Sequence, residues 1–142
     1  MTRVQKVYGD LNVTGNILRK ELMEIVLDDA TALTVGDAKG KIIVIPSSFN
    51  GMNLTSAHAS ITTVSSSGNP TITLYNLTDS VDMLSTAITI DAGEYSSFTA
   101  TTPPVIDTSH DDVATGDRIE INIDGAGTGA KGLSVYLVFQ TP

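Results

Sequence analysis

The chain has 142 residues, a formal net charge of −8, and few charged (17%) or aromatic (5%) residues. This length suits one domain with a real core, and the absence of cysteine excludes disulfides and thiolate metal sites. The acidic excess argues against a nucleic-acid partner, and no apolar run reaches the roughly 20 residues that a membrane-spanning helix needs. The N-terminus lacks the apolar segment of a signal peptide, so we expect neither a membrane partner nor secretion by a cleaved signal.

The first twenty residues are predicted to form an extended arm. The arm has one acidic residue, Asp10, against four cations, which are Arg3, Lys6, Arg19 and Lys20. Residues 42–117 show the opposite balance, with eight acidic residues and no Lys or Arg. This asymmetry predicts a protein that is anchored at one end and exposed at the other.

Within the arm, apolar Leu11, Val13 and Ile17 alternate with polar residues, and glycines interrupt the pattern. A single strand of this kind leaves both of its edges unpaired, so it is expected to pair with another chain or a sibling subunit. The predicted capsid-binding or subunit-binding residues of the arm are Arg3, Lys6, Val7, Tyr8, Leu11, Val13, Ile17, Arg19 and Lys20.

The body, residues 21–142, is predicted to be one β-domain, rich in Thr, Ser, Val and Ile. Residues 22–27 fit a strand or a helical turn, and the acidic pair that follows favours a strand. Residues 31–35 are a short extended piece. Residues 41–46 are apolar on both faces, which predicts a central strand ended by Pro46.

The middle of the chain alternates apolar and polar residues between turn residues. This pattern predicts a strand over 53–64, a loop over 65–70, strands over 71–77 and 84–90, and a strand through Tyr95 and Phe98.

The last forty residues predict the clearest strands. Residues 103–116 are a loop or one short helix, and residues 117–124 are a half-buried strand. The glycine-rich residues 125–132 predict a hairpin connection with positive φ angles, followed by a two-faced strand over 133–140. Roughly seven to nine short strands in all predict an all-β fold, an antiparallel β-sandwich or jelly roll.

Few residues suggest chemistry. His58 and His110 have no metal-binding spacing, and we interpret them as a polar strand residue and an exposed loop residue. Four acidic residues around a turn are compatible with an oxygen-ligated cation such as calcium, but a solvated acidic loop is the favoured interpretation; they are Asp107, Asp111, Asp112 and Asp117.

The common catalytic motifs are missing. The glycine-rich run lacks the Gly-Lys-Ser/Thr ending of a phosphate-binding loop, and no Gly-x-Ser-x-Gly occurs. Paired carboxylates for glycoside cleavage need only proximity in space, but few aromatic residues are left to line a sugar groove. We therefore expect no enzyme, no cofactor and no resident metal.

Two segments resemble a known group of proteins. Residues 7–17, Val-Tyr-Gly-Asp-Leu-Asn-Val-Thr-Gly-Asn-Ile, resemble the Gly-Asp-Leu-x-Val-x-Gly-Asn-Ile segments of tailed-bacteriophage fibre and virion-surface proteins. Residues 113–119 and 127–133 are similar to the closing strands of phage structural β-sandwiches. The first motif occurs once here, whereas long fibres repeat their shaft segments, so the resemblance favours a short head fibre, a decoration protein or a compact tip.

The resemblance implies a non-enzymatic virion protein assembled in the host cytoplasm. It implies a homotrimer whose arm binds the major capsid protein or neighbouring virion subunits while the β-domain points outward to decorate or stabilise the head. The alternative is a short tail fibre or receptor-binding tip, in which residues 65–70 or 103–116 contact a host glycan or protein.

Overall fold

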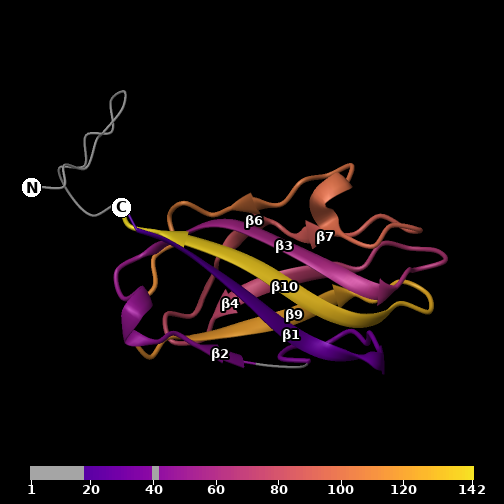
Figure 1. Cartoon of the computed structure of the whole chain (residues 1–142), viewed down its shortest axis with the longest axis horizontal. Helices are drawn as coiled ribbons and strands as arrows, with labels where there is room; N and C mark the ends of the chain where they lie inside the picture. The colour runs from indigo at the N-terminus through magenta and orange to yellow at the C-terminus, as the bar shows by residue number, and fades with distance from the viewer. Residues whose placement is uncertain (1–17, 40–41) are drawn as a thin grey trace, which may run out of the picture.

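The computed structural model describes residues 18–39 and 42–142, which form two antiparallel sheets packed face to face. Sheet A has the order β1-β10-β3, with β1 at an edge and β10 in the centre (Figure 1). Its strands are β1 (Arg19–Ala32), β10 (Lys131–Gln140) and β3 (Asn53–Thr63).

Sheet B has the order β2-β9-β4-β5, and β7 also pairs with β4. Its strands are β2 (Ile42–Val44), β9 (Arg118–Gly125), β4 (Thr71–Asn76), β5 (Val81–Asp82) and β7 (Ile88–Thr89). The remaining elements are a two-stranded sheet and two short 3-10 helices, namely β6 (Leu84–Thr86) with β8 (Val105–Ile106), η1 (Ser47–Phe49) and η2 (Ser97–Thr99).

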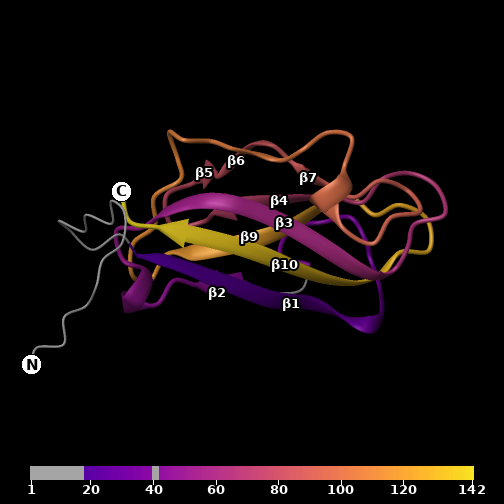
Figure 2. The ribbon, with the colours of Figure 1, turned by 45° about the horizontal axis from the view of Figure 1, so that its top comes forward.

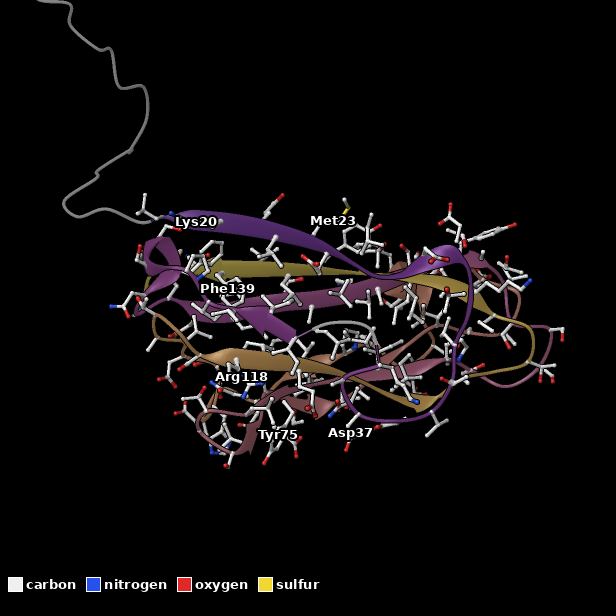
Figure 3. All side chains as sticks on the ribbon, turned by 90° about the horizontal axis from the view of Figure 1, so that it is seen from below. Lys20, Met23, Asp37, Tyr75, Arg118 and Phe139 are labelled. Carbon is white, nitrogen blue, oxygen red and sulfur yellow. The ribbon has the colours of Figure 1, made fainter. Side chains whose placement is uncertain are left out.

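The core lies between the two sheets because each strand turns its apolar side inward. In sheet B the alternating Ile119, Ile121 and Ile123 are almost fully buried. Sheet A contributes Phe139, whose ring meets that of Phe49 edge to face at 5.3 Å between centroids. Figure 3 shows Phe139 between the two layers. The predicted all-β antiparallel sandwich is confirmed, and within the described residues no helix is long and apolar enough to cross a membrane.

The first and last strands meet at one narrow end of the sandwich, which we call the arm end (Figures 1 and 2). The backbone N–H of Leu18 donates to the Thr141 hydroxyl at 3.0 Å, and the Thr141 N–H donates to the Leu18 carbonyl at 2.9 Å. Three turns gather at the opposite end, which we call the loop end; they are residues 65–70, 91–94 and 125–130.

The acidic segment 107–117 lies at the arm end, since the Leu54 N–H donates to the Asp111 carbonyl at 2.7 Å and neighbouring Asn53 pairs with Gln140. The charge difference along the sequence is therefore not a charge difference between the two ends of the folded body.

Several strand predictions are confirmed, including those over 53–64, 71–77 and 117–124. The first strand begins at Arg19, so the last two residues of the predicted arm lie in sheet A. The prediction of a central strand over 41–46 is wrong, because β2 is an edge strand in which Ile43 is buried and Val44 is exposed.

The prediction of one strand over 84–90 is also wrong. The segment contains two short strands with different partners: β6 pairs with β8, and β7 pairs with β4.

The strand predicted through Tyr95 and Phe98 is replaced by η2. The Ser96 side chain caps this helix by accepting from the Phe98 N–H at 3.4 Å. The segment 103–116 is a loop that contains the two-residue strand β8.

The glycine-rich connection joins β9 of sheet B to β10 of sheet A, so it is not the predicted hairpin. The predicted positive φ angles are present at Gly127 (65°), Gly129 (74°) and Gly132 (67°).

Candidate functional site

The outer face of sheet A carries a shallow groove. Two rows of outward side chains cross the three strands there, because the register pairs Met23 with Tyr136 and His58, and Glu21 with Val138 and Ser56. Both rows lie on the face opposite the core, and Figure 3 shows Met23 pointing away from the sandwich. The groove has a volume of about 420 Å³, and its lining includes all six of these residues.

An aromatic side chain forms one wall of the groove. Phe98, carried by η2, stacks on the His58 ring with centroids 4.2 Å apart and an angle of 20° between the planes. The Phe98 ring also lies 6.2 Å from the Tyr136 ring. Phe98 is nevertheless 63% exposed, so its remaining surface is available for contact.

Buried Ser97 fixes the orientation of His58. The Ser97 hydroxyl oxygen accepts from the Ala59 N–H at 3.0 Å and lies 2.8 Å from Nδ1 of His58. Since the hydroxyl already accepts a hydrogen bond, its own proton can go to Nδ1, which leaves the proton of the neutral ring on Nε2. Burial lowers the pKa of His58, which favours this neutral form.

The polar rim of the groove is formed by an exposed pair on β1, Arg19 and Glu21, with 3.5 Å between Nη2 and Oε1. At its floor the Tyr136 hydroxyl lies 2.8 Å from the Ser60 hydroxyl. The groove therefore offers apolar and aromatic surface between a few satisfied polar groups. Such a surface suits the binding of apolar side chains.

The acidic loop is organised by its own hydrogen bonds. Asp107 accepts from the Ser109 N–H at 2.9 Å and lies 2.9 Å from Nδ1 of His110, and these contacts lower the pKa of Asp107. Burial, followed by the nearby charges of Asp112 and Asp107, raises the pKa of Asp111. Asp117 is buried and accepts from Asn76 instead. Among residues 18–39 and 42–142, no group of three His, Cys, Asp or Glu side chains could hold a metal ion.

The predicted arm residues are divided by the structure. Seven of them lie outside the described residues: Arg3, Lys6, Val7, Tyr8, Leu11, Val13 and Ile17. Arg19 stands at the rim of the groove. Lys20 points to the other side of β1, where Nζ lies 5.5 Å from the centroid of the Phe49 ring.

Sequence reasoning missed the groove. Met23, Tyr136 and Val138 were treated only as strand residues, and Phe98 was placed in a strand that does not exist. One signal was present, because residues 133–140 are apolar on both faces, and a two-layer sandwich covers only one face of each sheet. The second apolar face therefore had to be exposed or covered by something else.

Comparisons of the chain with protein-family models, with curated protein sequences and with solved structures find no match.

Proposed function

We propose that this chain is a non-enzymatic structural protein of a tailed-bacteriophage particle. Its arm binds the major capsid protein or a neighbouring virion subunit, and its sandwich stands on the outer surface as part of a homotrimer that decorates or stabilises the head. The proposal rests on the resemblance of residues 7–17 to segments of phage fibre and virion-surface proteins.

One structural observation carries the proposal further. The described chain starts at one narrow end, where Leu18 is hydrogen-bonded to Thr141. The two sheets bury their core between them. An arm that extends from this end is placed to bind a separate surface while the sandwich stands away from that surface. Twenty extended residues reach roughly 60 Å, which is enough to cross a neighbouring subunit.

The binding mode follows from strand chemistry. An extended arm that joins a sheet edge gains main-chain hydrogen bonds, and its apolar residues occupy pockets on the partner. The arm cations add a salt-sensitive attraction to an acidic shell surface. Repetition around a threefold axis turns weak single contacts into strong attachment.

Electron cryomicroscopy of assembled particles that contain this chain tests the proposal. We expect sandwich density at threefold or pseudo-threefold positions on the head, with the arm end toward the shell. A Leu11→Asp/Val13→Asp variant should lose this density, because two charges replace apolar anchors. The matched control, Asn12→Asp/Thr14→Asp, adds the same charge at polar positions of the same arm and should keep it. Particles without density for the chain, or equal attachment of both variants, would contradict the proposal.

The loop end favours a second candidate, a receptor-binding tip. Residues 65–70 gather there with two other turns, and the exposed Tyr95 is close by, since its carbonyl accepts from the Ile61 N–H at 2.8 Å. The segment 103–116 does not join them, because its residue Asp112 bridges to Asn53 at the arm end. Density confined to the tail, together with weaker host-cell binding of particles that carry Tyr95→Ala, would support this second candidate.

A further inference from the structure

Large apolar side chains stand exposed on the outer face of sheet A. Met23 is 60% exposed and Ile25 is 61% exposed on the edge strand β1, and Phe98 stands 63% exposed over β3. Between them runs the groove, whose wall and floor include Tyr136 and Val138. A continuous exposed patch of this kind usually marks an interaction site.

We propose that the occupant of this face is a second copy of the same chain. Copies pack their sheet A faces together around an axis that runs along the strands, so that Met23 and Ile25 of one copy contact the groove region of the next. The inference deepens the proposed function by naming the contact that groups the arms, and it rests on that function only for what the grouped arms bind.

Charge selects this face for self-association. The described residues include fifteen acidic and five basic side chains, so most approaches of two copies bring like charges together. The outer face of sheet B is of this kind, since among the described residues of its strands Asp82, Glu120 and Asp124 accompany one cation, Arg118. On sheet A the one opposite pair, Arg19 with Glu21, leaves the groove without net charge. Two sheet A faces can therefore meet without the repulsion that the rest of the surface imposes.

The position of the first described residue fits the same contact. Leu18 directly precedes Arg19, which lines the groove, and it lies at the arm end beside Thr141. If copies associate through sheet A with their strands running the same way, Leu18 of every copy, and with it the point where the preceding seventeen residues attach, lies at the same end. Their contacts with a particle then act together, which multiplies the strength of attachment.

The test is the mass of the full chain in solution, measured by analytical ultracentrifugation from about 1 µM to 1 mM. We expect a closed multiple of 14.9 kDa for the wild-type chain. The double variant Met23→Lys/Ile25→Glu keeps the net charge and places charged groups in the contact. It should raise the dissociation constant at least about 100-fold.

The matched control is Val44→Lys/Val105→Glu, which makes the same exchange at exposed apolar residues on β2 and β8 and should keep the wild-type mass. Far-ultraviolet circular dichroism and thermal unfolding of both variants separate dissociation from unfolding. A monomeric wild-type chain would overturn the inference, and so would a sheet A variant that associates as well as the control. Neither result depends on a particle, so attachment through the arm is judged separately.

Discussion

The two ends of the sandwich are both closed by a buried polar residue, but the chemistry differs. At the loop end Ser65 is fully buried, and its hydroxyl accepts from the Thr128 N–H at 2.9 Å while lying 2.7 Å from the carbonyls of Ser67 and Gly68. At the arm end the carboxylate of Asp117, 5% exposed, accepts from the Asn76 amide and the Ala114 N–H, each at 3.0 Å.

The comparison teaches that the buried polar group at each end suits the spacing of the loops that it connects. Glycine-rich turns approach closely enough for one small hydroxyl to bridge them. The arm end brings wider loops together. There the carboxylate of Asp117, the residue just before β9, has more acceptor capacity and joins β4 to the 107–117 segment.

The largest effect is expected from crowding the loop end. A Cβ at Gly127 would collide with the Ser65 hydroxyl and lie 2.8 Å from its Cβ, at a φ of +65°. We expect Gly127→Ala to cost about 3 kcal/mol or more in urea unfolding. Gly129→Ala is the control, because its φ is also positive but no atom lies within 4 Å of the new Cβ, and it should cost about 1 kcal/mol. Equal losses of stability would show that the positive φ of the turn, and not the contact with Ser65, determines the cost of the substitution.

At the arm end, Asp117→Ala removes the acceptor from two donors in buried surroundings, so we expect a loss of about 2–3 kcal/mol in the free energy of unfolding. The exposed Asp82 near the same end provides the control, and Asp82→Ala should stay within about 0.5 kcal/mol. A loss below about 1 kcal/mol for Asp117→Ala would mean that water replaces the carboxylate.

Ser65→Ala should cost less, about 1–2 kcal/mol, because only one neutral hydroxyl is lost and the Thr128 N–H keeps a second acceptor, the Ser67 carbonyl at 2.9 Å. The neighbouring Ser66 is exposed, and Ser66→Ala should change the urea midpoint very little. If Ser65→Ala lowers the free energy of unfolding more than Asp117→Ala does, our ranking of the two buried polar side chains is wrong.

The smallest expected effect is a change in how stability depends on pH in acid. Asp91 at the loop end accepts from the Thr101 hydroxyl at 2.7 Å and its N–H at 2.8 Å, and these bonds lower the pKa of Asp91 below its ordinary value of 3.8. A carboxyl with a lowered pKa stabilises the fold above 3.8, and this contribution is lost as the pH falls through the lower folded value. Urea midpoints between about pH 6 and pH 2.5 should fall more steeply for the wild type than for Asp91→Asn. Parallel curves would contradict the assignment.

The pKa of Asp107, at the arm end, is shifted in the same direction, because hydrogen bonds from the Ser109 N–H and His110 lower it. Hydrogen exchange at the two ends over the same pH range then shows which turn opens first. The comparison of the ends is thereby extended from neutral pH to acid.

Much of the fold follows from local pattern. The strands β3, β4 and β9 were predicted because apolar and polar residues alternate along them, and the period of two is fixed by the pleat. Sheet order is not local, however. The apolar residues of β2 could not reveal that the strand lies at an edge, since Ile43 and Val44 look equivalent in sequence and differ only in what covers them.

The candidate site was harder to predict for the same reason. The groove joins β1, β10, β3 and η2, which are distant in sequence. It depends on the bond between Ser97 of η2 and Ala59 of β3, and the sequence around Ser97 looked like a strand. Only the two apolar faces of residues 133–140 indicated that an uncovered surface would exist.

The position at which β1 begins has a mechanical consequence. β1 starts at the arm end and runs antiparallel to the central strand β10, with an unbroken register from Arg19 to Ile25. If the chain is held just before Arg19 and force acts on the loop end, the load is directed along the strands, across hydrogen bonds that lie perpendicular to it. Those bonds then share the load in shear and do not open one at a time, so a sandwich held at the start of β1 resists a pull along its long axis.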